Sequence, residues 1–281
     1  MHWRELEARL VASLGPVEGR IVLEEVSGER YVELFARRDA EVEPAACAAA
    51  RRLEKRRLTG EPLQRVLGHW SFRGLELHVD ERALIPRPET EIVVDHVLRG
   101  LAAQRRQRSE LLVVDLGTGS GAIALAVASE APDTRVIATD RSLVALALAA
   151  ENRARLGPAA GRVHFVCGDW WEPLGGGLDG RVDVVVANPP YLSRTEWELA
   201  PAVVREWDPP QALVGGEEGT EGIAAVIAGG ARVLSPGGLL VVEIGAGQAA
   251  AVRVLACRAG AECVSVEPDL AGRDRVLVAT W

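Results

Sequence analysis

From residue 111 onward, short apolar runs alternate with longer stretches whose apolar residues recur at helical spacing. The apolar runs predict strands at 111–116, 135–139, 163–167, 182–187 and 239–244. The longer stretches predict helices at 122–130, 143–156, 220–234 and 248–259. Strands that alternate with helices are typical of a doubly wound, parallel α/β sheet, because each helix returns the chain to the edge where the previous strand began. Two last runs, 263–267 and 275–280, predict a terminal antiparallel pair.

The N-terminal part of the chain has helical periodicity alone. Leu6, Leu10 and Leu14 recur at helical spacing, and Pro44 marks the start of another helix. After Trp70 the period changes to two, with a turn signal at Arg73-Gly74. We therefore expect a helical bundle over 1–68, a β-hairpin with a proline-stiffened connector over 69–90, and a larger domain over 91–281.

Composition excludes several classes of protein. The chain of 281 residues is 48% hydrophobic and 26% charged, which is typical of soluble globular proteins. No apolar run approaches the roughly 18 residues of a membrane span. Arg4 and Glu5 interrupt any signal-peptide core, and the four cysteines form no CxxC pair. We therefore expect a cytoplasmic protein with reduced cysteines and no metal site. The net charge of −8 argues against general binding of nucleic acid.

A glycine-rich turn joins the first strand of the larger domain to its first helix. It reads Asp115-Leu-Gly117-Thr118-Gly119-Ser120-Gly121. Glycines let the backbone approach a ligand closely, and a helix N-terminus offers free N–H groups, so we expect a nucleotide-like cofactor here. Asp140, at the end of the next strand, is placed to accept both ribose hydroxyls. This spacing fits NAD as well as S-adenosylmethionine, and a tight turn without a ligand is the remaining alternative.

The motif Asn188-Pro189-Pro190-Tyr191 follows the strand at 182–187 directly. A planar amide nitrogen is a poor nucleophile, because its lone pair is delocalised enough to give a rotation barrier of about 18–20 kcal/mol. Two acceptors aimed at the two N–H hydrogens favour tetrahedral nitrogen; the Asn188 side-chain oxygen and the Pro189 carbonyl can provide them. The Tyr191 ring offers a stacking face. The motif predicts transfer of a methyl group to a planar nitrogen; a stiff loop around a buried tyrosine is the alternative.

At these residues the sequence resembles the S-adenosylmethionine-dependent methyltransferases that modify planar nitrogens, whose hallmark is NPPY or DPPY. Within them it is similar to the peptide-chain release-factor glutamine methyltransferases, the PrmC or HemK family. The resemblance covers nearly the whole chain after residue 60. The matching segments are 84–91, 115–121, Asp140, 168–170, 188–191, 212–216, 243–245 and 269–275.

The resemblance implies a fold and roles for particular residues. It implies a seven-stranded, Rossmann-like class I sheet, and a helical N-terminal domain that grips the release factor. Residues 117–121 would cradle the methionine part of S-adenosylmethionine, Asp140 would hold the ribose, and Trp170 would border the adenine. Asn188 to Tyr191 would hold the glutamine of the factor's Gly-Gly-Gln tip. Asp169 would orient the adenine amine, or cap a turn.

Two other enzymes would share much of this sequence. A ribosomal-protein glutamine methyltransferase would look the same in its catalytic half. A DNA adenine N6-methyltransferase would need a basic recognition region, whereas this chain is acidic. A non-catalytic sensor of S-adenosylmethionine would have no use for the acceptor motif. The segments Gln64–Gly68, His69-Trp70 and Asp208-Pro209 depart from the family pattern, which puts partner contacts in doubt more than chemistry.

Three weaker signals carry open alternatives. The basic stripe of Arg51, Arg52, Lys55, Arg56 and Arg57 is favoured as a solvated helix face over a contact with ribosomal RNA or the factor. Arg87 either reaches the active site or forms a surface ion pair. Glu243 is interpreted as a structural partner for a neighbouring backbone group rather than as a catalyst.

Overall fold

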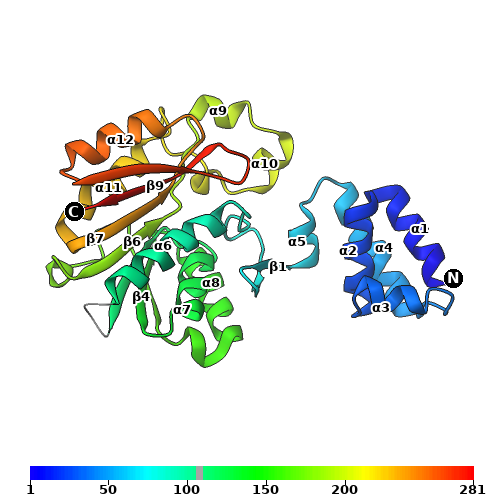
Figure 1. The fold of residues 1–281 in the computed structure, drawn as a ribbon. Helices are drawn as coiled ribbons and strands as arrows, with labels where there is room; N and C mark the ends of the chain where they lie inside the picture. The colour runs from blue at the N-terminus through cyan, green and yellow to red at the C-terminus, as the bar shows by residue number, and fades with distance from the viewer. Residues whose placement is uncertain (106–109) are drawn as a thin grey trace. The chain divides into compact units, whose positions relative to one another are not determined.

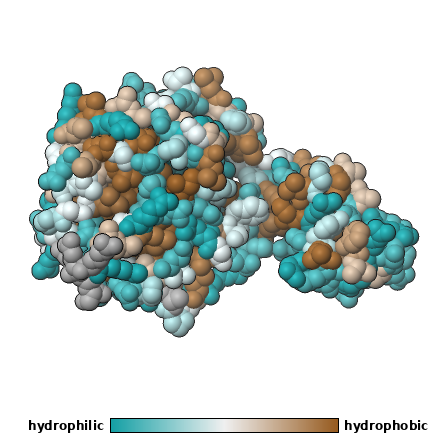
Figure 2. Space-filling model, viewed as in Figure 1, coloured by the Kyte–Doolittle hydropathy of each residue, from teal (hydrophilic) through white to brown (hydrophobic). Residues whose placement is uncertain are grey.

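The computed structural model describes residues 1–105 and 110–281, which form two compact units, Met1–His69 and Trp70–Trp281 (Figure 1). In the described part of the chain, no helix is both long enough and apolar enough to cross a membrane. Both units have surfaces on which brown apolar side chains interrupt teal hydrophilic ones (Figure 2).

The first unit is a helical bundle, as the apolar spacing predicted. Its helices are α1 (Trp3–Leu14), α2 (Pro16–Ser27), α3 (Tyr31–Ala36), α4 (Pro44–Leu58) and α5 (Leu63–Leu67). Leu6 and Leu10 of α1 are fully buried against Val22 and Leu23 of α2. The two helices pack closely at Gly19, where an added Cβ would lie 2.8 Å from the Leu10 carbonyl carbon. A glycine is therefore needed at this crossing.

The predicted hairpin is present and is formed by β1 (His69–Phe72) and β2 (Leu75–His78). Arg73 and Gly74 make the turn with φ of 48° and 74°. Positive φ at both central residues matches the twist of the paired strands. The arginine side chain is held by Asp95 and by Glu130, which stabilises this uncommon backbone conformation.

The large sheet has seven strands in the order β5-β4-β3-β6-β7-β9-β8. They are β3 (Leu111–Leu116), β4 (Thr134–Asp140), β5 (Val163–Cys167), β6 (Val182–Ala187), β7 (Leu234–Glu243), β8 (Cys263–Pro268) and β9 (Asp274–Thr280). The first five in spatial order are parallel, and β9 is antiparallel to both of its neighbours. This confirms the predicted α/β class and the terminal pair. The strand order reverses between β3 and β6, where such sheets bind ligands beyond their carboxyl ends.

Helices cover both faces of this sheet (Figure 1). They are α6 (Thr90–Gln104), α7 (Ala122–Glu130), α8 (Leu143–Leu156), α11 (Glu221–Val233) and α12 (Ala249–Arg258). Along β6, Val184 and Val186 belong to the core under α6 and α7, whereas Val185 belongs to the core under α11 and α12. Burial on both faces explains why these strands are continuous apolar runs rather than alternating ones.

Two features differ from the prediction. β7 begins at Leu234 instead of 239, because Leu234 pairs with Val182 before the register shifts. The residues after Leu234, Ser235-Pro-Gly-Gly238, are typical of a turn, so the sequence gives no sign that Leu234 pairs as part of a strand. Short helices also occur where none was predicted. They are α9 (Arg194–Glu198), α10 (Ala202–Trp207), and the 3-10 turns η1 (Gly157–Ala160), η2 (Gly176–Leu178) and η3 (Pro210–Ala212).

Candidate active site

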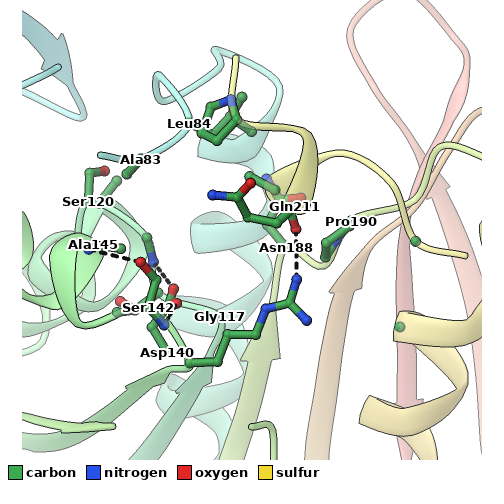
Figure 3. Close-up of a pocket in the computed structure, with 18 of the residues that line it drawn as sticks. Ala83, Leu84, Gly117, Ser120, Asp140, Ser142, Ala145, Asn188, Pro190 and Gln211 are labelled. Atoms are coloured by element: carbon green, nitrogen blue, oxygen red, sulfur yellow. Dashed lines mark hydrogen bonds between the residues drawn. The ribbon is translucent and has the colours of Figure 1, made fainter. Parts of the chain in front are cut away.

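A pocket of about 430 Å³ lies at the carboxyl ends of β3, β4 and β6, at the point where the strand order reverses (Figure 3). This volume is within the range of small-molecule sites, about 300–1,000 Å³. Most of the residues that the sequence singled out line it. They are Gly117, Thr118, Gly119, Ser120, Asp140, Asp169, Trp170, Asn188 and Pro190. Asp115, Gly121, Pro189 and Tyr191 are not among its lining residues.

The glycine turn has a backbone that other residues rarely adopt. Gly117, Gly119 and Gly121 have φ of 74°, 56° and 84°. Gly121 also precedes the first residue of α7, and an added Cβ there would lie 3.1 Å from the Cβ of Ala149. Conformation requires all three glycines, and packing adds a second requirement at Gly121.

Asp140 joins the glycine turn to the end of β4. Its Oδ2 accepts the Gly119 N–H at 2.9 Å, and its Oδ1 accepts the Ser142 N–H at 2.8 Å (Figure 3). Each carboxylate oxygen has two lone pairs, so both oxygens keep capacity for further donors in the pocket. A charged acceptor beside a glycine turn matches the vicinal hydroxyls of a ribose. The residues present therefore fit S-adenosylmethionine.

Asp115 lies below this turn and is fully buried. Its Oδ2 accepts the Thr118 hydroxyl at 2.6 Å. Burial raises the pKa of this carboxyl to about 7, with Asp140 adding to the effect. Through its hydrogen bond with Thr118, Asp115 supports the conformation of the glycine turn.

Trp170 forms part of the pocket wall with a φ of 41°, an uncommon value for a bulky side chain. Its ring lies against two glycines: an added Cβ would be 3.6 Å from it at Gly117 and 3.4 Å at Gly222. The Thr139 hydroxyl donates to its carbonyl at 3.5 Å. Backbone strain of this kind is typical of functional sites, where the surroundings hold it in place.

Asn188 is the half-buried first residue after β6, and it is connected to two buried side chains. Its Nδ2 donates to the Thr90 hydroxyl at 3.2 Å, and that hydroxyl donates to Glu243 Oε2 at 2.7 Å. The interpretation of Glu243 as a partner for a backbone group was wrong, since its carboxylate accepts hydrogen bonds from the side chains of Thr90 and Tyr191, which belong to other segments. Burial raises the pKa of Glu243 to about 7.

Tyr191 packs against the apolar core under α11 and α12. Burial raises the pKa of its phenol to about 12, and the nearby Glu243 adds to the effect. The phenol is therefore neutral at physiological pH. Its main-chain carbonyl accepts the Gln248 side-chain amide at 2.8 Å, which anchors the end of the motif.

Arg87 lines the pocket, as the first of the two alternatives had it, and its ion pair is not the expected surface pair, because its partner is buried. Its Nη2 lies 2.6 Å from Oδ2 of Asp208, whose side chain is only 4% exposed. The ion pair is therefore largely buried on one side. Asp208, noted above as a departure from the family pattern, is the residue that accepts the hydrogen bond of Arg87.

Sequence reasoning assigned no role to most of the pocket's other walls. These walls come from residues 82–90, 141–145 and 209–216, including Leu84, Ser142 and Gln211. The segments 84–91 and 212–216 carried family motifs, which was the available signal. Among the described residues, no group of three or more His, Cys, Asp or Glu side chains is arranged to hold a metal ion.

A seven-stranded sheet of this order, with a cofactor pocket at its reversal point and an NPPY motif after β6, defines a class I S-adenosylmethionine-dependent methyltransferase. A solved structure with this fold is the hMettl16 catalytic domain in complex with a MAT2A 3′UTR hairpin. The TM-score is 0.59 at 13% identity, over 98% of this chain and 90% of that chain.

Family comparisons are more specific. A methyltransferase small domain matches residues 93–206, and a PrmC N-terminal domain matches residues 4–68. The release factor glutamine methyltransferase of Bordetella pertussis is 41% identical over 92% of this chain and 93% of its own. That of Moorella thermoacetica is 43% identical over 88% of this chain and 84% of its own. This chain belongs to the release factor glutamine methyltransferase family.

Proposed function

We propose that this protein methylates the side-chain N5 of the glutamine in the Gly-Gly-Gln motif of peptide-chain release factors, using S-adenosylmethionine. Relatives of about 40% identity over most of both chains are named release factor glutamine methyltransferases. The observation that carries the proposal is that Asn188, the glycine turn and Asp140 line one and the same pocket. An acceptor motif and a nucleoside-binding carboxylate thus face the same space.

The cofactor would be held by the residues around the glycine turn. Asp140 would accept the ribose hydroxyls, residues 117–121 would contact the methionine part, and Trp170 with Asp169 would border the adenine. When bound, S-adenosylmethionine supplies an electrophilic methyl group on a positively charged sulfur. Asp115 would act on it through Thr118, since its carboxylate accepts the Thr118 hydroxyl.

The acceptor motif would hold the glutamine amide by both of its hydrogens. Asn188 directs its Nδ2 to Thr90, so its Oδ1 is available to a substrate N–H. The Pro189 carbonyl would accept the second hydrogen, and Pro190 would line the wall beside it. The amide nitrogen then moves toward tetrahedral geometry, which frees its lone pair for attack. After the transfer the nitrogen sheds a proton to water, so no protein base is needed.

Tyr191 would support the glutamine from the end of the motif. Its phenol hydrogen-bonds to Glu243 and its main-chain carbonyl accepts from Gln248, so the ring and the backbone of Tyr191 are both held in place. Closure of this pocket around the amide would orient donor and acceptor, a contribution that can reach about 7–11 kcal/mol.

The bundle over residues 1–68 would grip the release factor. It matches a PrmC N-terminal domain and exposes the large apolar side chains Val17, Val32 and Phe35. These side chains are the ones through which we propose that the bundle contacts the factor. We further propose that the protein works in the cytoplasm, which agrees with the four free cysteines.

Radiolabel transfer tests the proposal. The protein is incubated with methyl-labelled S-adenosylmethionine and a purified release factor, and again with a factor whose tip glutamine is changed to alanine. We expect label on the first factor only, and a transfer rate with Asn188→Ala enzyme that is lower by about 10²- to 10³-fold. Label that survives the change of the glutamine, or that appears instead on DNA or on a ribosomal protein, would overturn the proposal.

A further inference from the structure

We infer that Thr90 and Glu243 are positioning residues that decide which end of the Asn188 carboxamide faces the pocket. The inference rests on the proposed function, in which Asn188 accepts a hydrogen from the substrate amide. Neither residue needs to touch the substrate for this role, because both act through Asn188.

The three side chains come from three separate elements of the second unit. Thr90 is the first residue of α6, Glu243 is the last of β7, and Asn188 follows β6. The parallel register pairs Ala187 with Val242, so the residues after them, Asn188 and Glu243, come level at the edge of the sheet. Thr90 lies between them, 3.2 Å from Asn188 Nδ2 and 2.7 Å from Glu243 Oε2. Thr90 is 4% exposed and Glu243 is 1% exposed, so water does not replace these contacts.

The polarity of this chain of hydrogen bonds follows from counting protons. An ionised carboxylate only accepts, so the single proton of the Thr90 hydroxyl goes to Glu243. The hydroxyl oxygen is then left as an acceptor, and only the NH2 end of Asn188 can meet it. The Asn188 Oδ1 is consequently turned away from Thr90. A flipped amide would place two oxygens in contact and would offer the substrate N–H groups a donor instead of an acceptor.

This polarity depends on the charge of Glu243. The groups that act on it are Thr90 and Glu89 at the start of α6, Tyr191 after β6, and Arg275 on β9. Arg275, Thr90 and Tyr191 favour the ionised form, whereas burial and Glu89 oppose it. If Glu243 is protonated it can donate to Thr90, and the Thr90 proton is then free to point at Asn188. Either end of the Asn188 amide then fits, and the oxygen no longer faces the pocket reliably.

Three variants and one matched control test the inference. Thr90→Val keeps the shape and removes the hydroxyl, Thr90→Ser restores the hydroxyl, and Glu243→Gln removes the charge. The control is Thr134→Val, which removes a fully buried hydroxyl from β4 that has no hydrogen-bond partner among the described residues. Each variant is assayed for kcat and KM with the release factor, and for S-adenosylmethionine affinity by calorimetry.

We expect Thr90→Val to lower kcat by at least about tenfold, since misplacement of a reacting group by about 1 Å can cost 10²-fold. Cofactor affinity should stay within about twofold, because the Asp140 contacts are intact. Thr90→Ser should recover most of kcat, and Thr134→Val should leave it unchanged. Wild-type kcat in Thr90→Val, or equal losses of kcat and cofactor affinity, would overturn the inference. Full activity of Asn188→Ala would instead overturn the proposed site.

Glu243→Gln supplies a readout that a purely structural role would not move. In the wild type, kcat should fall as pH drops below about 7, because Glu243 becomes protonated. The glutamine variant should show a lower kcat without that acidic limb, since its amide can present either a donor or an acceptor at every pH. A variant that retains the wild-type pH profile would contradict the inference even if it is slower.

Discussion

Arg87 and Asp208 lie 121 residues apart in the sequence and are joined by a hydrogen-bonded ion pair of 2.6 Å. Arg87 belongs to the connector before α6, and Asp208 directly follows α10 and precedes the wall segment 209–216. Both segments line the pocket, so the pair ties two of its walls together. Asp208 is 4% exposed at its side chain, which makes the loss of its partner costly.

Arg87→Ala should therefore destabilise the protein and weaken the pocket. A charged hydrogen bond of this kind contributes about 1.5–3 kcal/mol, and truncation leaves the Asp208 carboxylate with one partner fewer. We expect a loss of about that size in urea unfolding, together with weaker S-adenosylmethionine binding. Arg87→Lys should recover part of both, since it keeps the charge but not the planar fork.

Arg194→Ala is the matched control. Arg194 also pairs with an acidic side chain, Glu217, but both side chains are more than half exposed. Exposed pairs contribute about 0–1 kcal/mol, so this variant should unfold almost as the wild type does. Equal effects of the two substitutions would mean that the Arg87 pair does not hold the pocket walls.

The fold was largely predictable because its signals are local. Strands such as β3 and β6 are buried on both faces and are therefore continuous apolar runs, and the hairpin turn needs only Arg73-Gly74. The helices α9 and α10 were not predicted, because they bury no residue fully and therefore have no apolar face that the sequence could reveal. The start of β7 was predicted five residues too late, because turn-forming residues follow Leu234.

The site was predictable only in part, for a related reason. The glycine turn and Asn188 could be identified from residue type and spacing alone. The bonds that connect Thr90 with Asn188 and with Glu243 span 98 and 153 residues, and they depend on the register of β6 and β7 and on the packing of α6 against the sheet. No local pattern encodes such a contact, so the sequence indicated a structural role for Glu243 but not the side chains that it contacts.

Asp140 and Asn188 should separate binding from turnover. Asp140→Ala removes an acceptor of two ribose hydroxyls and also frees the Gly119 N–H, so S-adenosylmethionine affinity should fall by about 10- to 100-fold. Asn188→Ala should lower kcat by about 10²- to 10³-fold, by analogy with removal of an oxyanion-hole donor, with a small effect on cofactor affinity. Calorimetry and single-turnover kinetics measure the two. Equal losses in both quantities for both variants would refute this division of roles.

Gly19→Ala should loosen the bundle although alanine favours helices. The gain in helix propensity is about 1 kcal/mol, whereas overpacking costs about 1–3 kcal/mol. The added Cβ would lie 2.8 Å from the backbone of Leu10. A backbone atom within a helix cannot move aside as the end of a flexible side chain can. Hydrogen exchange of the amides of α1 and α2 should become faster. Gly175→Ala, where a Cβ meets no atom within 4 Å, is the control. Unchanged exchange in Gly19→Ala would show that the helices can separate without cost.

Asp115→Asn should change how stability depends on pH. Burial raises the pKa of Asp115 to about 7 in the folded state, from 3.8 when unperturbed. Below 3.8 both states hold the proton; between 3.8 and 7 the unfolded chain has released it, so folding loses stability as pH rises through this window. Asparagine carries no such proton. The free energy of unfolding of Asp115→Asn, relative to wild type, should therefore rise between pH 4 and pH 8, by on the order of 2–4 kcal/mol. Urea titrations across that range measure it, and parallel curves for the two proteins would show that Asp115 ionises in the fold as easily as in water.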